Sequence, residues 1–237
     1  MQAMIFAAGL GTRFKPWTDQ HPKALAIVNG KSLLQRNVAY LQQWGITEMV
    51  VNVHHFAAQV EAAVTTSAGW GSNIRISDEQ EAVLETGGGL FHARSLLQGS
   101  DFVTINVDIL TDLDLGAMIH FHRQQQALVT LAVSDRSTSR YLLIDEGGQL
   151  CGWRNTATGQ EKLPVPKEGL KQKAYSGIAV FDSRIFDLMQ QRGKFSLIDV
   201  YLSLAASERI LAFDHSGGRL VDVGKPESVA IAELLFP

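Results

Sequence analysis

The sequence has almost no cysteine, no excess of basic residues and no long apolar run, and each shortage excludes a class of protein. Cys151 is the only cysteine among 237 residues, so neither an intramolecular disulfide nor a cysteine-rich zinc site can form. This usage suits a reducing compartment, and we expect a cytoplasmic protein. The net charge of -3 provides no general basic field for a nucleic-acid polymer. No uninterrupted apolar stretch approaches the roughly 20 residues of a membrane helix, so we expect no membrane partner.

A packed interior is expected, because hydrophobic residues make up 46% and charged residues 19% of the chain. Strands are predicted over residues 3–8, 48–53, 73–77, 101–107 and 127–133, and helices around residues 34–41, 56–64, 89–97 and 115–122. This alternation predicts an α/β fold, a Rossmann-like three-layer sandwich with a mostly parallel mixed sheet. Ligands of such a sheet lie beyond the carboxyl ends of its strands. We expect a single domain over residues 1–237.

The pattern changes after residue 140. Tyr141–Ile144 and Gln149–Trp153 flank a turn and predict a β-hairpin. Residues 155–173 are polar and rich in glycine and proline, which predicts a long exposed loop. The insertion around residues 141–173 is therefore a candidate lid. Strands are expected again at 174–181 and 219–223, and helices at 197–206 and 226–235.

The strongest local signal directly follows the first predicted strand. It reads Gly9-Leu10-Gly11-Thr12-Arg13-Phe14-Lys15-Pro16, with Pro22-Lys23 a few residues later. Glycines let the backbone approach an anion closely, and successive free amide groups can cradle phosphate oxygens. Arg13 adds a planar fork of donors and Lys23 a point charge. The segment is predicted to bind phosphate groups.

Three other interpretations of this segment explain less. A dinucleotide site needs GxGxxG, but Phe14 occupies the position of the third glycine. A P-loop needs a glycine-lysine pair followed by serine or threonine, and no such stretch exists. A simple strand-exit turn would need only the glycines and would leave Arg13 and Lys23 unexplained.

The stretch AAGLGTRFKP, followed by PK, resembles the N-terminal signature of sugar-phosphate nucleotidyltransferases. Further segments resemble the motifs of that family in the same order: Leu84-Glu85-Thr86-Gly87-Gly88-Gly89, Asn106-Val107-Asp108, Tyr175-Ser176-Gly177-Ile178 and Val221-Asp222-Val223-Gly224. The resemblance spans almost the whole chain. Within the family, the LETGGG loop and the compact length most resemble bacterial N-acetylmuramate 1-phosphate uridylyltransferases, and similar short members are mannose-1-phosphate guanylyltransferases.

The resemblance implies the nucleotide-diphospho-sugar transferase fold and the transfer of a nucleotidyl group from a nucleoside triphosphate to a sugar 1-phosphate. Pyrophosphate leaves, and the product is a nucleotide sugar for cell-wall or polysaccharide synthesis. The implied roles are nucleotide binding by Ala8, Gly9, Gly11, Thr12, Gly87, Gly88 and Asn106; sugar binding by Glu85, Ser176 and Gly177; metal binding by Asp108 and Asp222; and catalytic charge stabilisation by Arg13 and Lys23.

The two acidic residues have a physical reason to meet. Asp108 and Asp222 each fall at the end of a predicted strand, so the carboxyl edge of a parallel sheet could bring both carboxylates together. Mg²⁺ prefers a few carboxylates together with phosphate oxygens and water. The nucleophile would be an oxygen of the sugar phosphate, which is largely dianionic at pH 7 and needs no protein base.

Other functions stay open at this point. The chain could be a mannose-1-phosphate guanylyltransferase or a non-catalytic protein that binds nucleotide sugars. The cytidylyl or guanylyl transfer of molybdenum-cofactor maturation shares the opening motif but explains the LETGGG segment poorly. The base, the sugar and the choice between a monomer and a homodimer are left open by the sequence.

Overall fold

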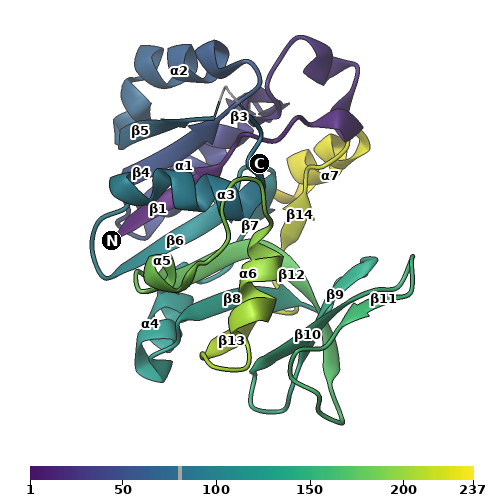
Figure 1. The fold of residues 1–237 in the computed structure, drawn as a ribbon. Helices are drawn as coiled ribbons and strands as arrows, with labels where there is room; N and C mark the ends of the chain where they lie inside the picture. The colour runs from purple at the N-terminus through teal and green to yellow at the C-terminus, as the bar shows by residue number, and fades with distance from the viewer. Residues whose placement is uncertain (80–81) are drawn as a thin grey trace.

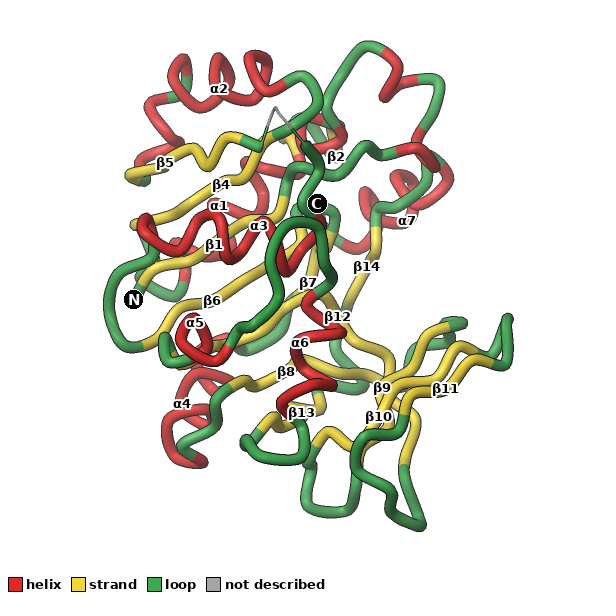
Figure 2. The backbone as a smooth tube through the Cα atoms, viewed as in Figure 1, coloured by secondary structure: helices red, strands yellow, loops and turns green. Residues whose placement is uncertain are grey.

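The computed structural model describes residues 1–79 and 82–237, and within them the centre of the protein is a ten-stranded mixed sheet (Figures 1 and 2). Its strands are β1 (Gln2–Phe6), β4 (Glu48–Val53), β5 (Asn73–Asp78), β6 (Asp101–Asn106), β8 (Val129–Ser134), β9 (Arg140–Ile144), β10 (Leu150–Asn155), β11 (Gln160–Lys162), β12 (Lys171–Asp182) and β13 (Ile210–Asp214). The order is β11-β10-β9-β12-β6-β1-β4-β5, and β8 joins β12 to β13. Strands β6, β1, β4 and β5 are parallel, whereas β12 is antiparallel to β6.

Helices cover both faces of the sheet, as Figure 1 shows. One face packs against α1 (Leu33–Gln43), α2 (Ala57–Thr66) and α4 (Leu115–Gln125), and the other against α3 (Glu85–His92), α5 (Ile185–Leu188) and α6 (Leu197–Leu204). Along β1, Ala3 and Ile5 join the first core and Met4 the second. Side chains of a strand alternate between faces, so a strand covered on both sides is apolar throughout. The predicted three-layer α/β fold is confirmed.

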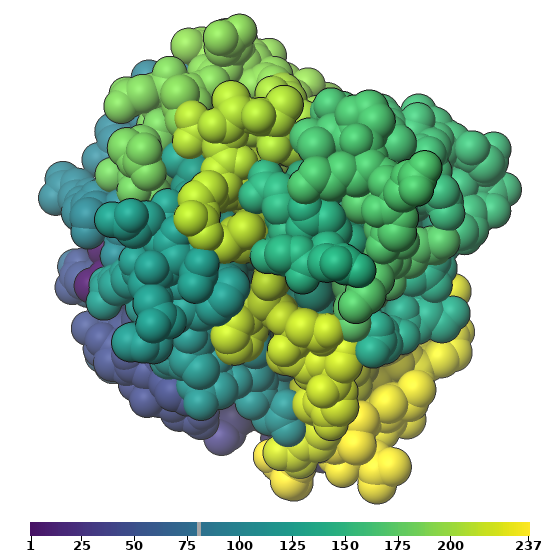
Figure 3. Space-filling view, turned by 90° about the horizontal axis from the view of Figure 1, so that it is seen from below, coloured from purple at the N-terminus to yellow at the C-terminus, as the bar shows by residue number. Residues whose placement is uncertain are grey.

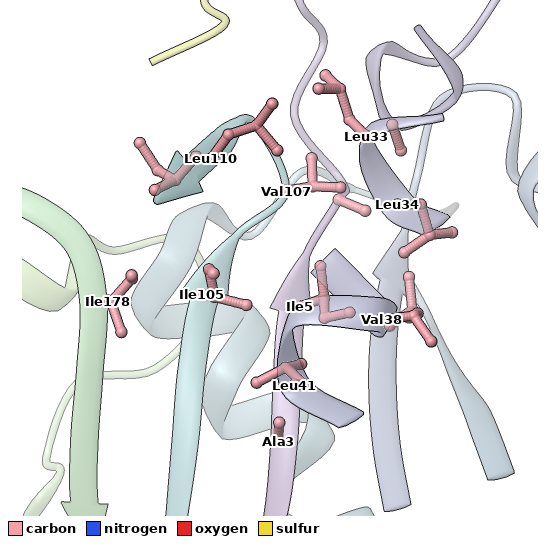
Figure 4. Packing of buried hydrophobic residues seen from close by; sticks show 14 of the residues in the cluster. Ala3, Ile5, Leu33, Leu34, Val38, Leu41, Ile105, Val107, Leu110 and Ile178 are labelled. Atoms are coloured by element: carbon pink, nitrogen blue, oxygen red, sulfur yellow. The ribbon is translucent and has the colours of Figure 1, made fainter. Parts of the chain in front are cut away.

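Helix α1 illustrates how the sequence builds this packing. Ser32 caps its start, because the side-chain oxygen accepts a hydrogen bond of 3.1 Å from the amide of Gln35. Leu34, Val38 and Leu41 recur at helical spacing, are fully buried and face the sheet in Figure 4. Within the described residues, no helix is both long and apolar enough to cross a membrane.

The first strand is shorter than predicted at its carboxyl end. It stops at Phe6 instead of Ala8, because the amide of Ala7 donates to Oδ1 of Asn52 at 2.7 Å and leaves the strand ladder. The loop that follows contains 3-10 turns at Thr12–Phe14, Trp17–Asp19 and Lys23–Leu25 and the short strands β2 (Ile27–Val28) and β3 (Lys31–Ser32). The chain beyond the central sheet adds β7 (Ile109–Thr111), β14 (Leu220–Asp222) and α7 (Glu227–Leu235).

Residues 140–173 form an arm that stands out from the sheet and bulges from one side of the molecule in Figure 3. Strands β9 and β10 pair as an antiparallel hairpin. The expected long loop over residues 155–173 is wrong in part: β11 pairs with β10, and β12 already begins at Lys171, where it pairs with β9. Strand β11 reads QEK and is exposed throughout, so no apolar alternation marks it in the sequence. The lid role stays a prediction.

The predicted helix at residues 89–97 begins earlier than expected. Helix α3 starts at Glu85, and a 3-10 turn over Ala93–Leu96 follows it, so Gly87, Gly88 and Gly89 are helical. A Cβ atom on Gly87 would lie 2.5 Å from a ring carbon of Phe195, and one on Gly88 only 2.2 Å from the carbonyl oxygen of Gly193. The glycines therefore let residues 193–195 pack directly against the helix backbone.

We predict that Gly88→Ala destabilises the protein by about 1–3 kcal/mol, although alanine favours a helix by about 1 kcal/mol over glycine. The added methyl would meet a backbone oxygen, which a rotamer change does not move. Urea unfolding followed by circular dichroism measures the change. Gly147→Ala is the matched control, because its Cβ would meet only a side-chain oxygen at 3.4 Å. Equal stabilities of the two variants would contradict the packing role.

Candidate functional site

A cavity of about 480 Å³ opens beyond the carboxyl ends of β1, β4 and β6. The edge of a parallel sheet is where an α/β fold is expected to hold its ligand. Many of the predicted site residues line this cavity: Ala8, Gly9, Gly11, Thr12, Arg13, Lys23, Glu85, Asn106 and Asp108. Segments from the first and second quarters of the chain thus meet in one place.

The glycine-rich loop forms one wall of the cavity. Gly11 has a left-handed backbone with φ near 60°, and a Cβ there would lie 2.8 Å from Thr18, so only glycine fits without strain. Phe14, in place of a third glycine, is buried in the core and anchors the loop. Thr12 and Arg13 are exposed and face the cavity. The loop is therefore anchored in the core by Phe14, while the cationic side chain of Arg13 is exposed toward the cavity.

The two predicted metal-binding residues are brought together by a short strand pairing: Asp222 ends β14, and Asp108 directly precedes β7. Strands β7 and β14 are antiparallel, and Asp222 is paired with Ile109, the residue after Asp108. The amide of Val223 donates to the carbonyl oxygen of Asp108 at 2.8 Å, which closes the pairing. Residues 114 positions apart in the chain are thus held side by side by backbone hydrogen bonds. Gly224, next along, lines the cavity.

The electrostatics of this pair fit a divalent cation. Burial, and then the neighbouring charge of Asp108, raises the pKa of Asp222, while Lys23 and Arg13 act to lower it. Oδ1 of Asp222 is buried and finds no hydrogen-bond partner among the described residues. A cation between two close carboxylates would satisfy that oxygen and offset the repulsion.

The protein offers only part of a metal's coordination shell. Within residues 1–79 and 82–237, no group of three or more aspartate, glutamate, histidine or cysteine side chains could hold an ion. A hard cation such as Mg²⁺ needs six oxygens and commonly takes several from substrate phosphates and water. The two carboxylates fit that kind of site, in which the substrate completes the shell.

Two cations flank the carboxylates from the phosphate-loop side. Lys23 is 9% exposed, and its Nζ forms an ion pair with Oδ2 of Asp108. A Cβ on Gly224 would lie 2.7 Å from Oδ1 of Asp222 and 3.0 Å from Nη2 of Arg13, so Arg13 and Asp222 border the same glycine. The predicted catalytic and metal-binding residues are therefore brought together.

Asn52 and Glu79 also line the cavity, and sequence reasoning missed both. Oδ1 of Asn52 accepts from Ala7, its Nδ2 donates to Glu79 at 2.7 Å, and Glu79 accepts from the amide of Leu84 at 3.4 Å. Burial raises the pKa of Glu79. One signal could have found them: a polar residue inside the apolar run EMVVNV and an acid just after the next strand, both at the ligand edge of the sheet.

The segment around Glu85 carries backbone strain beside the cavity. Glu85 has φ near 60°, which is unfavourable for a residue with a side chain and is enriched at functional sites. Glu85 and Thr86 line the cavity, and Oγ1 of Thr86 accepts from the amide of Leu197 at 3.1 Å. The first turn of α3 is thereby fixed to α6 at the cavity wall.

Gly87 and Gly88 were predicted to bind the nucleotide, but their amide groups hydrogen-bond within the protein. Both amides donate to the carbonyl oxygen of Phe195, at 2.9 and 3.2 Å, and neither residue lines the cavity. We expected these backbone groups to read a base, but they are used in packing. The reason is the earlier start of α3, which turns this segment from a loop into a helix.

Ser176 and Gly177, predicted to bind the sugar, lie behind the cavity wall. Ser176 is fully buried, and its Oγ shares a hydrogen bond of 2.8 Å with Nε2 of His215. Gly177 has φ near 75°, at the bulge where the register of β12 shifts. A Cβ on it would lie 2.9 Å from Nδ2 of Asn106, which does line the cavity. Gly177 thus contacts a cavity residue without forming the wall itself.

Comparisons with known proteins agree with this geometry. The nucleotidyl transferase family model matches residues 2–235. The N-acetylmuramate alpha-1-phosphate uridylyltransferase of Neisseria meningitidis serogroup B is 44% identical over 231 residues, covering 94% of this chain and 93% of that protein. The enzyme of the same name from Caulobacter vibrioides is 31% identical, covering 98% of this chain and 95% of that protein.

A solved structure shares the fold. HddC from Yersinia pseudotuberculosis superposes with a TM-score of 0.80 at 22% identity, covering all of this chain and 99% of that one. At that identity the likeness carries the fold alone. Because the family model matches nearly the whole chain, this chain belongs to the nucleotidyl transferase family.

Proposed function

We propose that the protein transfers a uridylyl group from UTP to N-acetylmuramate 1-phosphate, with Mg²⁺ as cofactor, and releases pyrophosphate. The observation that carries this proposal is the pair of acidic residues Asp108 and Asp222, which backbone pairing holds side by side, with Asp108 lining the same cavity as the phosphate loop. The identity of 44% to a curated uridylyltransferase over nearly the full length favours this substrate pair.

The attacking group is an oxygen of the sugar 1-phosphate. At pH 7 this phosphate is largely dianionic, because its second pKa is near 6, so no side chain has to remove a proton. The oxygen attacks the α-phosphorus of UTP, and the bond to the β-phosphate oxygen breaks. The task of the chain is to orient the two phosphates and to offset their charge.

Four charged side chains fit this task. Asp108 and Asp222 would hold Mg²⁺, which supplies positive charge to both phosphates when bound. Arg13, on the exposed rim of the loop, is suited to bind the β- and γ-phosphates through its planar donors. Lys23, buried beside Asp108, is suited to offset the charge that develops near the α-phosphate.

The remaining wall of the cavity is suited to the nucleoside. The chain of hydrogen bonds from Ala7 through Asn52 to Glu79 links the end of β1 to the segment that leads into α3. It would fix the position of the wall residues Glu85 and Thr86 against the loop. Of the residues expected to bind sugar, Glu85 is the one on the cavity wall.

The alternatives differ in base, in sugar or in turnover. A matrix assay of pyrophosphate release with UTP, GTP, CTP, dTTP and ATP, against the 1-phosphates of N-acetylmuramate, mannose, glucose and N-acetylglucosamine, separates them. We expect the highest kcat/KM for UTP with N-acetylmuramate 1-phosphate. A preference for GTP with mannose 1-phosphate would instead identify a guanylyltransferase. Tight nucleotide binding without any pyrophosphate release would identify a non-catalytic binding protein.

Asp108→Asn should lower kcat more than about 100-fold. Removing a residue that only hydrogen-bonds to a metal ligand already lowers metal affinity or activity by about 10- to 100-fold, and Asp108 would be a ligand itself. The fold should persist, as circular dichroism would record, because Asp108 lies at the cavity and outside both cores. Asp187→Asn, which changes an exposed carboxylate on α5, is the control. Turnover at the wild-type rate in Asp108→Asn would refute the metal assignment.

Lys23→Ala should lower kcat by about 100-fold, the usual effect of removing one preorganised donor at a charged transition state. The variant also leaves Asp108 without its ion-pair partner. Single-turnover measurements at saturating UTP and Mg²⁺ separate this effect from weaker binding. Lys31→Ala, at an exposed lysine in β3, serves as the control. A rate within twofold of the control would remove Lys23 from the chemistry.

A further inference from the structure

N-acetylmuramate 1-phosphate differs from other sugar 1-phosphates by one charged group. Its lactyl ether carries a carboxylate, whereas N-acetylglucosamine 1-phosphate has the same ring with a free hydroxyl in that place. An enzyme that selects the acidic sugar needs a cation for this second anion, apart from those that serve the phosphates. Arginine is the side chain best matched to a carboxylate, because its planar donors bind both oxygens.

Arg136 is anchored near the metal pair through β12. It donates to the carbonyl oxygen of Tyr175, two residues before Gly177, and a Cβ on Gly177 would lie 2.9 Å from both Nδ2 of Asn106 and Cγ1 of Ile109, which lie on either side of Asp108 in the chain. Two other cations border the metal pair. Lys23 is paired with Asp108, and Arg13 belongs to the phosphate loop. Arg136 comes from elsewhere, in the connection between β8 and β9 that leads into the arm. It is therefore a cation near the metal pair that the transfer chemistry leaves unused.

The guanidinium of Arg136 is held in place by a backbone hydrogen bond and not by an ion pair. Its Nη2 donates to the carbonyl oxygen of Tyr175 at 2.9 Å, while its Nε is buried and has no partner among the described residues. Within residues 1–79 and 82–237, Arg136 takes part in no ion pair. The neighbouring Asp135 binds Lys173 instead, at 2.6 Å.

The backbone around Arg136 connects it to the cavity wall through β12. Tyr175, which fixes the guanidinium, begins the bulge of β12 that includes Ser176 and Gly177. Gly177 contacts Asn106, and Asn106 is on the cavity wall. A half-buried cation with an unused donor costs free energy unless a ligand compensates it. The position next to the metal pair makes an anionic part of the second substrate the fitting ligand.

We propose that Arg136 is a specificity residue that binds the carboxylate of an acidic sugar 1-phosphate. The inference rests on the proposed function and adds the group that recognises the sugar. A purely structural role is the competing explanation, in which Arg136 only ties the β8–β9 connection to β12. That role would affect all sugar substrates equally.

The test compares two substrates that differ by the lactyl group. Wild type, Arg136→Gln and Arg136→Lys are assayed with UTP, Mg²⁺ and either N-acetylmuramate 1-phosphate or N-acetylglucosamine 1-phosphate. In Arg136→Gln, the ratio of kcat/KM for the acidic over the neutral sugar should fall by about 10- to 100-fold, the range of a charged hydrogen bond. The loss should lie mainly in KM, and Arg136→Lys should recover part of it.

Arg140→Gln is the matched control, because Arg140 is an exposed arginine at the start of β9. Its ratio should stay within twofold of wild type. An equal change of both substrates in Arg136→Gln, or no change, would overturn the inference while leaving uridylyl transfer intact. A wild type that prefers the neutral sugar would also overturn it. A wild type that releases no pyrophosphate with either sugar would instead refute the proposed function, and this inference with it.

Discussion

The short pairing between β7 and β14 is the interaction on which the site depends. It matches Asp222 with Ile109 and adds the hydrogen bond from the amide of Val223 to the carbonyl oxygen of Asp108, so two acidic residues from distant segments lie next to each other. Each strand is only three residues long, and the pair gains its stability from packing, since Leu110 and Val221 are both in the core. The positions of the two acidic residues are thus set by backbone and apolar contacts.

The fold could be predicted from the sequence because its central strands are continuous apolar runs and its helices show a clear period of 3.6 residues. The place of Asp108 could be predicted as well, since it follows β6 at the ligand edge of the parallel strands. The expectation that the same sheet edge carries Asp222 is wrong, because Asp222 ends β14, which pairs antiparallel with β7 outside the central sheet. The arm could not be predicted, because β11 is polar and exposed and its pairing depends on partners elsewhere in the chain. The start of α3 was hidden by its glycines, which favour a loop locally but are needed for the close contact with residues 193–195.

Residues that support the site from behind were the hardest to predict. Asn52 and Glu79 look ordinary in sequence, and only the meeting of three segments makes them a continuous hydrogen-bonded wall. Ser176 matched a family segment, yet its side chain is fully buried against His215. A segment can therefore resemble a binding motif while only some of its side chains reach the cavity. Which ones do so depends on the bulge at Gly177.

The ion pair between Lys23 and Asp108 has a consequence for the order of events at the site. The ammonium group of Lys23 occupies the carboxylate oxygen of Asp108 that an incoming cation would need as a ligand. Metal binding is then an exchange, in which the lysine must be given another anion before it releases the oxygen. A nucleotide phosphate is such an anion, so the two ligands should strengthen each other's binding by the same factor. In the absence of nucleotide, a free metal ion would have to compete with Lys23 for the carboxylate of Asp108.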